Sequence, residues 1–370
     1  MRLFVCCFLL CCLFYASVCT LTFAQDITQW RQIIDKNAPK TLPDNLGSKR
    51  PDTDTADACK TVVETADKML ADADLTEKDR RWALQRKAAS LIILSYADTA
   101  AYYPRLAAVS DELHKNGIKN LSKETEKHLL LIGKTFVLTE KQDENNRSLK
   151  ALAERMVSYA EQYPGTESDI LIENFLTNIR QLNLAARDAR LAVAAPVFHQ
   201  YFQKINRFAK VQTLESDIRR STLVGKPMYL AGTDLNGTPL NADSLANKVI
   251  LVQFWGTWCR PCKEEIPALI KLYEKYHASG FEIVGINTGI GGDTVKKVDD
   301  FVKTTAFGGK KIPWIILHEG QEQKNPVSQF YGIKELPVLI LIGRDGKVLH
   351  LHPPVGTLDA AVAAALAPGT

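Results

Sequence analysis

The chain has 370 residues, of which 46% are hydrophobic and 24% are charged, and this composition excludes a disordered or fibrous protein. Its length is typical of about two globular domains. Lysine and arginine are interspersed with aspartate and glutamate, and the formal net charge is only +4, so the charge pattern does not indicate a nucleic acid as partner.

Residues 1–24 have the features of a secretory signal peptide. Met1 and Arg2 supply a positive start, residues 3–18 are almost wholly apolar, and Ala24 is a small residue at a cleavage point. An apolar run of about 16 residues is short for a membrane-spanning helix. We therefore predict an exported protein of the periplasm or cell envelope.

Two other fates of this segment stay open. The segment could be retained as an N-terminal membrane anchor, or it could be cleaved before Cys19, because the Ala-Ser-Val-Cys stretch that ends there weakly resembles a bacterial lipoprotein box. Cleavage after Ala24 leaves three cysteines, too few for a scaffold of several disulfides. They are Cys59, which we predict to be a buried or spare thiol, and the close pair Cys259 and Cys262.

Residues 25–53 carry prolines and a glycine among polar residues and are predicted to be a linker. Residues 54–220 then form long segments with apolar residues three and four apart, which predicts an all-α domain of about five to seven helices. Antiparallel hairpins in a bundle are favoured over a helical-repeat array. Expected breaks fall near residues 72–75, 103–104, 117, 143–146 and 164–165. The histidines here are isolated from one another in sequence, so we interpret this domain as a scaffold, spacer or surface for a partner protein.

Residues 221–370 alternate between strand and helix patterns, which predicts an α/β domain with a central mixed sheet. The turn Arg344-Asp345-Gly346 joins the last two strands. Strands are expected at 249–255, 281–286, 314–317, 338–342 and 348–351, and helices at 261–276, 294–305, 327–331 and from 358.

The stretch Cys259-Arg260-Pro261-Cys262 lies between the first of these strands and the first helix. Structural zinc needs about four ligands, and the chain has only this one close pair, which His350 and His352 would have to complete. A purely structural disulfide would close too small a loop to constrain the unfolded chain. Neither a metal nor another cofactor is therefore expected.

A redox couple uses every feature of the stretch. A cysteine at the start of a helix faces free main-chain N–H groups and the positive end of the helix, which stabilises its thiolate. Arg260 adds a positive charge, and Pro261 fits the first helical turn because its missing N–H costs nothing there. Cys259 is then the attacking thiol and Cys262 the resolving one.

The segment FWGTWCRPCKEEIP, residues 254–267, resembles the active-site segment of the thioredoxin superfamily, in particular of exported TlpA/ResA-type thiol-disulfide oxidoreductases. Residues 234–240 and 248–252 resemble the lead-in strands of that branch. Residues 332–338 and 339–346 are similar to its cis-proline loop and final hairpin. The similarity covers residues 223 to 370, under half of the chain.

The resemblance implies that Pro337 is cis and packs against the disulfide, which leaves the main chain of Leu336 free to pair with a substrate strand. Trp258, Arg260 and Pro261 are then expected, with Leu336, to contact the substrate. Val338 stands where the family often has threonine and Gly343 where it has aspartate. These departures affect the expected substrate preference more than the chemistry.

Cytoplasmic thioredoxins carry a buried aspartate in the strand before the motif, where this chain has Gln253. Glu265 is the candidate to replace it, because it lies three residues after Cys262 on the same helical face, as in the TlpA/ResA branch. Burial would raise the pKa of Glu265 and suit it to proton transfer with Cys262. A solvated helix glutamate is the alternative.

The leading hypothesis is an enzyme that reduces or exchanges protein disulfides, with protein thiols and disulfides as substrates and a membrane or envelope electron donor. A helical partner-binding protein with a redox-responsive appendage is a second interpretation. A peroxiredoxin-like peroxidase is disfavoured, because Gly256 stands three residues before Cys259 where that chemistry needs threonine or serine.

Overall fold

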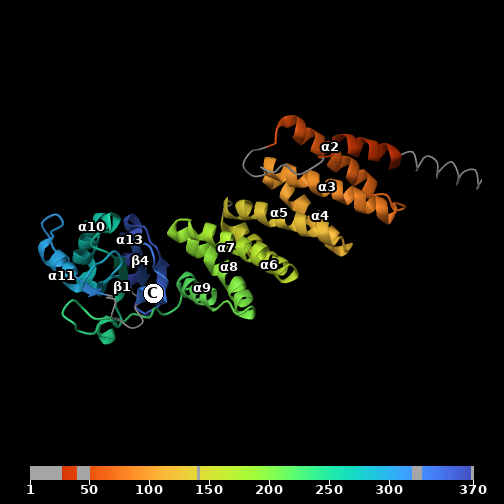
Figure 1. Cartoon of the computed structure of the whole chain (residues 1–370). Helices are drawn as coiled ribbons and strands as arrows, with labels where there is room; N and C mark the ends of the chain where they lie inside the picture. The colour runs from red at the N-terminus through yellow and green to blue at the C-terminus, as the bar shows by residue number, and fades with distance from the viewer. Residues whose placement is uncertain (1–26, 40–50, 140–141, 319–326, 368–370) are drawn as a thin grey trace, which may run out of the picture. The chain divides into compact units, whose positions relative to one another are not determined.

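The computed structural model describes residues 27–39, 51–139, 142–318 and 327–367 (Figure 1). The signal-peptide prediction for residues 1–24 lies outside them. The chain divides into two compact units, one ending at Phe175 and the other beginning at Leu176. The predicted domain limits of 54–220 and 221–370 stay predictions. No helix in the described ranges is both long and apolar enough to cross a membrane.

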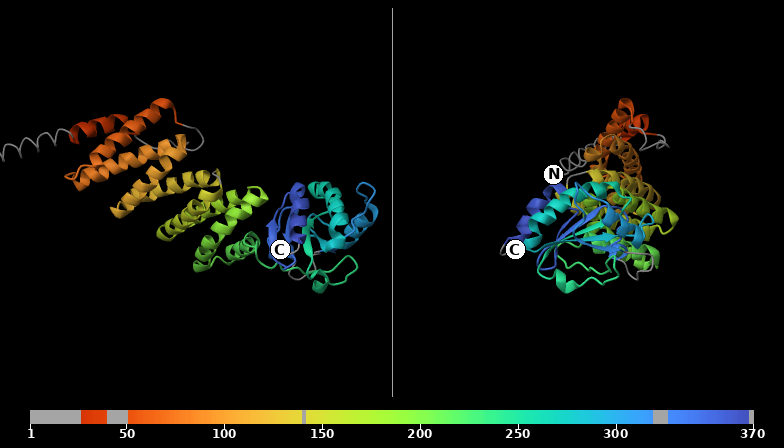
Figure 2. Two further views of the ribbon diagram at one scale, coloured as in Figure 1. Left: turned by 180° about the vertical axis from the view of Figure 1, so that it is seen from behind. Right: turned by 90° about the vertical axis from the view of Figure 1, so that its left-hand side faces the viewer.

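The first unit is wholly helical in its described part. Residues 27–37 form a helix, although a linker was expected there, and each later helix of the unit packs against the next up to α6 (Figure 2). The helices are α2 (Thr53–Leu70), α3 (Glu77–Ala97), α4 (Thr99–Lys115), α5 (Lys119–Thr139), α6 (Gln142–Gln162) and α7 (Thr166–Arg180), the last of which crosses the division between the units. With α8 and α9 of the second unit they make eight helices in the described residues 53–221, more than the five to seven expected.

Local sequence explains where these helices begin. The side chains of Asp52, Thr76 and Asp98 each accept a hydrogen bond from a main-chain N–H of the first turn. The break expected at Tyr103-Pro104 is wrong, because α4 already begins at Thr99 under the Asp98 cap and Pro104 lies inside it. Pro104 removes one main-chain hydrogen bond, and the helix is retained because its apolar face is buried in the core.

The second unit begins with a helical hairpin, in which α8 (Leu184–Lys204) packs against α9 (Phe208–Ser221). The α/β part follows, with the mixed sheet that the sequence predicts. Its strands are β1 (Val249–Trp255), β2 (Phe281–Asn287), β3 (Ile315–His318), β4 (Val338–Ile342) and β5 (Val348–Leu351). Its helices are α10 (Arg260–Tyr276), α11 (Val295–Thr304), α12 (Val327–Phe330) and α13 (Val355–Leu366).

The sheet has the strand order β3-β2-β1-β4-β5. β1, β2 and β3 are parallel, whereas β4 is antiparallel to both β1 and β5. Because side chains alternate along a strand, β1 serves two cores. Val249, Leu251 and Trp255 face the core formed with α10, α11 and α13, whereas Ile250, Val252 and Phe254 face the core formed with α12. β1 is therefore buried on both faces, and the turn to Cys259 follows the carboxyl end of this central strand.

Candidate redox site

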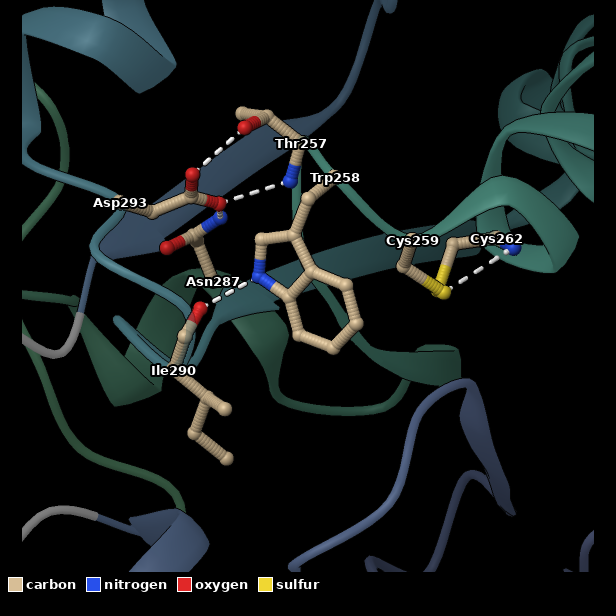
Figure 3. The surroundings of a disulfide bond; sticks show 7 residues. All are labelled: Thr257, Trp258, Cys259, Cys262, Asn287, Ile290 and Asp293. Atoms are coloured by element: carbon tan, nitrogen blue, oxygen red, sulfur yellow. Dashed lines mark hydrogen bonds between the residues drawn. A yellow bond between two sulfur atoms is a disulfide. The ribbon is translucent and has the colours of Figure 1, made fainter.

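Cys259 and Cys262 form a disulfide at the N-terminus of α10. Cys259 is the N-cap residue, and its Sγ accepts a hydrogen bond from the main-chain N–H of Cys262 at 3.3 Å (Figure 3). After reduction, the same N–H and the positive end of the helix would stabilise a thiolate on Cys259. Cys259 is 2% exposed and Cys262 is fully buried.

The residues around the pair differ in exposure. Trp258 is 47% exposed, and Arg260 and Pro261 are also exposed, so all three lie where a partner could contact them. The Arg260 guanidinium pairs with Glu264 at 2.7 Å on the surface of α10. The positive charge beside Cys259 is therefore shared with a neighbouring carboxylate.

A buried carboxylate holds the turn before Cys259. Asp293 accepts hydrogen bonds from the main-chain N–H of Thr257 at 2.7 Å, from the Thr257 hydroxyl at 2.5 Å and from the Asn287 amide at 2.9 Å (Figure 3). Lys297 Nζ lies 2.7 Å from Oδ1 of the same carboxylate, the oxygen that also accepts from the Thr257 hydroxyl. Burial alone would raise the pKa of Asp293, but these hydrogen bonds outweigh it and lower the pKa.

The Trp258 indole is fixed to the same loop. Its Nε1–H donates to the main-chain oxygen of Ile290 (Figure 3). A Cβ atom on Gly291, whose φ is +77°, would lie 2.3 Å from that indole nitrogen. Only glycine fits here, because its left-handed conformation and the close approach of the ring both exclude a side chain.

The role of Asp293 was not predicted from the sequence. The signal available for it was an aspartate directly after a glycine-rich loop.

Glu265 lies on α10, three residues after Cys262. Burial raises the pKa of its carboxyl group to about 7, and the nearby amide of Gln253 offsets this only in part. Glu265 Oε2 and Gln253 Nε2 are both buried without a hydrogen-bond partner within the described part of the chain. The alternative of a fully solvated helix glutamate does not fit this surrounding.

The loop before β4 completes the site. The peptide bond between Leu336 and Pro337 is cis, as expected. Val338 pairs with Phe254 at the end of β1, which places the cis-proline beside the turn that leads to Cys259. Leu336 is half-buried, and a Cβ on Gly256 would touch its Cδ1 at 3.4 Å. The structure thus brings together the predicted cysteine pair and the cis-proline loop, and it places Glu265 on the helix that Cys259 caps.

The histidines suggested as zinc ligands do not meet the cysteines in the described residues. His352 Nε2–H donates to Asp188 at 2.7 Å, at the end of β5. Across the described ranges, no group of three or more His, Cys, Asp or Glu side chains lies close enough to hold a metal ion.

The part of the chain that carries the disulfide and the cis-proline matches a known protein family. Residues 208–366 match the family model described as Redoxin, and the match begins at the first residue of α9. The C-terminal part of the chain is therefore a redoxin domain with a thioredoxin-like fold.

Curated relatives resemble the same part of the chain. The thiol-disulfide oxidoreductase ResA of Bacillus thuringiensis (strain Al Hakam) is 36% identical over 118 residues, which are 32% of this chain and 62% of the relative. ResA of Bacillus subtilis (strain 168) is 33% identical over 118 residues, or 60% of its length. The chain thus spans under two thirds of each relative. The solved thioredoxin domain of a thiol-disulfide oxidoreductase from Bacteroides vulgatus is 24% identical, with a TM-score of 0.33, over 39% of this chain and 98% of that structure.

Proposed function

We propose that the chain is an exported thiol-disulfide oxidoreductase that reduces or exchanges protein disulfides through its Cys-Arg-Pro-Cys couple. The observation that carries this proposal is the disulfide at the N-terminus of α10, with the cis-proline loop beside it. The ResA relatives, which are thiol-disulfide oxidoreductases by name, align with this part of the chain.

In the proposed reaction, the Cys259 thiolate attacks one sulfur of a substrate disulfide. A mixed disulfide forms through Cys259, and the other substrate sulfur leaves as a thiolate that takes up a proton. Cys262 then gives up its proton and attacks Cys259 Sγ, which releases the second substrate thiol and restores the Cys259–Cys262 disulfide. The substrate gains two electrons and the enzyme loses two.

Glu265 has the role of proton acceptor for Cys262 in this scheme. A carboxyl group with a pKa of about 7 exchanges protons readily near neutral pH, unlike an ordinary glutamate. Gln253 cannot take a proton, so the carboxylate on α10 stands in for the strand aspartate of cytoplasmic thioredoxins. The main chain of Leu336 would pair with that of the substrate, while Pro337 would pack against the disulfide. Trp258, Arg260 and Pro261 would contact the substrate as well.

The remaining parts of the proposal concern where the protein works, what reduces it and what it binds. The chain would work in the periplasm or cell envelope, receive electrons from an envelope or membrane donor, and bind a partner protein through the helical domain. The second candidate, a helical binding protein with a redox-responsive appendage, draws support from the separate compact helical unit that ends at Phe175. Disulfide exchange by the full chain with a small disulfide distinguishes the two.

A trapping experiment tests the roles of the two cysteines. Each variant is made in a Cys59→Ser background, reduced, and mixed with two extended peptides joined by a single disulfide. Cys262→Ser should accumulate a mixed disulfide through Cys259, seen by mass spectrometry of the intact protein, whereas Cys259→Ser should trap little. Equal trapping by both variants, or by neither, would contradict the assignment. The reduction potential of the couple is expected at about −270 to −180 mV, and a value near −120 mV would indicate an oxidant instead.

A further inference from the structure

Arg220, near the end of α9, is a buried arginine with no role in the reaction described above. Its residue is 1% exposed, and all five of its N–H groups have an acceptor. Three serve carboxylates: Nε and Nη2 donate to Asp188 at 2.9–3.0 Å, and Nη2 also donates to Asp217 at 3.2 Å. The other two, on Nη1, leave the helical hairpin and donate to main-chain oxygens of the α/β part.

Those two acceptors belong to the chain that leads into the cis-proline. Arg220 Nη1 donates to the oxygens of Tyr331 at 2.7 Å and Gly332 at 3.0 Å. Two consecutive peptide planes are thus oriented by one rigid guanidinium. Only three residues separate Gly332 from Leu336, the residue whose main chain faces a substrate strand in the proposed function.

Two more arginines of the hairpin act on the same segment. Arg219 Nε donates to the oxygen of Phe330 at 2.9 Å, and its guanidinium lies 4.5 Å from the centre of the Phe330 ring. Arg187 of α8, which is buried, pairs with Glu335 at 3.3 Å. Residues 330–335 are therefore held by the hairpin at both ends as well as in the middle.

The segment also touches α9 directly at Gly332. The φ of Gly332 is +60°, and a Cβ there would lie 2.7 Å from Ser216 Oγ and 3.1 Å from Arg220 Nη1. Glycine is needed for the left-handed turn and for the close approach to the helix. Contact and hydrogen bonding thus agree in fixing this one stretch of main chain.

The charge of Arg220 is balanced within the hairpin. Burial alone would raise the pKa of Asp188, but hydrogen bonds from His352 and Arg220 lower it to about 2, so the carboxylate stays charged. Asp217 is shared with Arg180, whose Nη2 donates to it at 2.9 Å. Asp188 and Asp217 already balance the charge of the guanidinium. Its hydrogen bonds to the loop oxygens therefore serve to position the loop and not to neutralise the arginine.

We propose that Arg220 is a positioning residue for substrate recognition: it holds residues 331–336 so that the main chain of Leu336 can pair with an extended polypeptide. This inference rests on the proposed function. It assigns the α8–α9 hairpin a part in distinguishing protein disulfides from small ones, because a small disulfide needs no main-chain pairing.

The test compares two substrates with the reduced full-length protein. One is the pair of extended peptides joined by a disulfide, and the other is cystamine, a small disulfide without peptide bonds. Followed as a single turnover, oxidation of reduced Arg220→Met by the peptide should half-saturate at an about three- to tenfold higher peptide concentration, as expected for about one lost hydrogen bond, and its rate at saturation should be unchanged. Its rate with cystamine should stay within about twofold of wild type. Arg220→Lys, which keeps the charge but lacks the planar fork, should fall between Arg220→Met and wild type.

Arg180→Gln is the matched control, because it removes another partner of Asp217 that makes no contact with the loop in the described structure. It should change neither rate. Gly332→Ala pushes the loop away from α9 while keeping the Arg220 side chain, and it should repeat the peptide-specific loss, which keeps the test decisive should Arg220→Met not fold. Equal losses with both substrates, or no loss with either, overturn the positioning role. A wild-type protein inert towards cystamine overturns the proposed function as well.

Discussion

Two loops of the redoxin domain meet at the disulfide, and the main chain of each is held by a buried charged side chain, which comes from a different part of the chain in the two cases. The turn before Cys259 is held by Asp293, which lies 34 residues further along within the same α/β part. The loop before Pro337 is held by Arg220, from a helix that precedes every strand of the sheet. The cysteine side of the site is thus self-contained, whereas the cis-proline side depends on the helical hairpin.

The largest expected effect comes from breaking the support of the cis-proline side. Asp188→Ala leaves the buried Arg220 without its main counter-charge, and we predict a loss of about 3–5 kcal/mol in the free energy of unfolding. Urea unfolding of the full chain measures it. Asp300→Ala is the control, because Asp300 pairs with Lys296 on an exposed face, and it should cost less than about 0.5 kcal/mol.

The same carboxylate sets an acid limit. The pKa of Asp188 is about 2 in the folded protein, below its ordinary value of 3.8, so its contribution is complete above about pH 4 and is lost as the pH falls towards 2. Asp188→Ala should remove that part of the acid dependence. An unchanged acid profile in the variant would show that other carboxylates cause it.

The support of the cysteine side should be somewhat less costly to remove. Asp293→Ala leaves the main-chain N–H of Thr257 and the Asn287 amide unpaired and buried, while the exposed Lys297 regains water. At about 1–2 kcal/mol for each of these two donors, the lower part of the usual range for a buried donor left unpaired, we predict a total loss of about 2–4 kcal/mol in unfolding free energy. A loss as small as that of Asp300→Ala would mean that the turn is held by other contacts.

Glu265 gives a smaller effect with the opposite pH sign. Its folded pKa of about 7 exceeds the ordinary 4.5, so the folded state binds the proton more tightly, and stability falls as the pH rises from about 4.5 to about 7. Glu265→Gln should remove this decline and stabilise the oxidised protein at pH 8 by roughly 1–2 kcal/mol, allowing for partial exposure. It should also flatten the pH profile of disulfide exchange near pH 7. A wild-type slope retained in the variant would contradict the assignment.

The smallest effect is expected at Trp258. Trp258→Phe removes the hydrogen bond to Ile290 but keeps an aromatic ring at an exposed position, so stability should fall by about 0.5–1 kcal/mol. Thermal unfolding measures it. A loss as large as that of Asp293→Ala would assign the main support of the turn to the indole.

The sequence predicts the self-contained half of the site well because its signals are local. β1 was expected at 249–255, where the structure has it, and α10 and β4 lie within one residue of expectation. The cysteine pair, Pro337 and Glu265 are found together because each is read from a short motif or a helical spacing. A helix break predicted from a single proline was less reliable, since Pro104 lies inside α4 and not between two helices.

The side chains that support the two loops could not be predicted from the sequence, for a physical reason. Arg220 and its acceptors at Tyr331 and Gly332 are more than 110 residues apart, and the acceptors are main-chain oxygens that carry no residue identity. Asp293 is nearer to Thr257, but it bonds partly to a main-chain N–H as well. Side chains that support a loop through its main chain leave no pattern in the loop itself.

Cys59 is buried on α2, and burial raises the pKa of its thiol, an effect that the neighbouring Ser90 offsets only in part. A thiol that stays protonated is a poor nucleophile towards disulfides and alkylating reagents at neutral pH. Brief treatment of the reduced, native protein with iodoacetamide should therefore modify Cys259 well before Cys59. A fluorescent label could in this way be placed at the redox site of the native protein without first replacing Cys59.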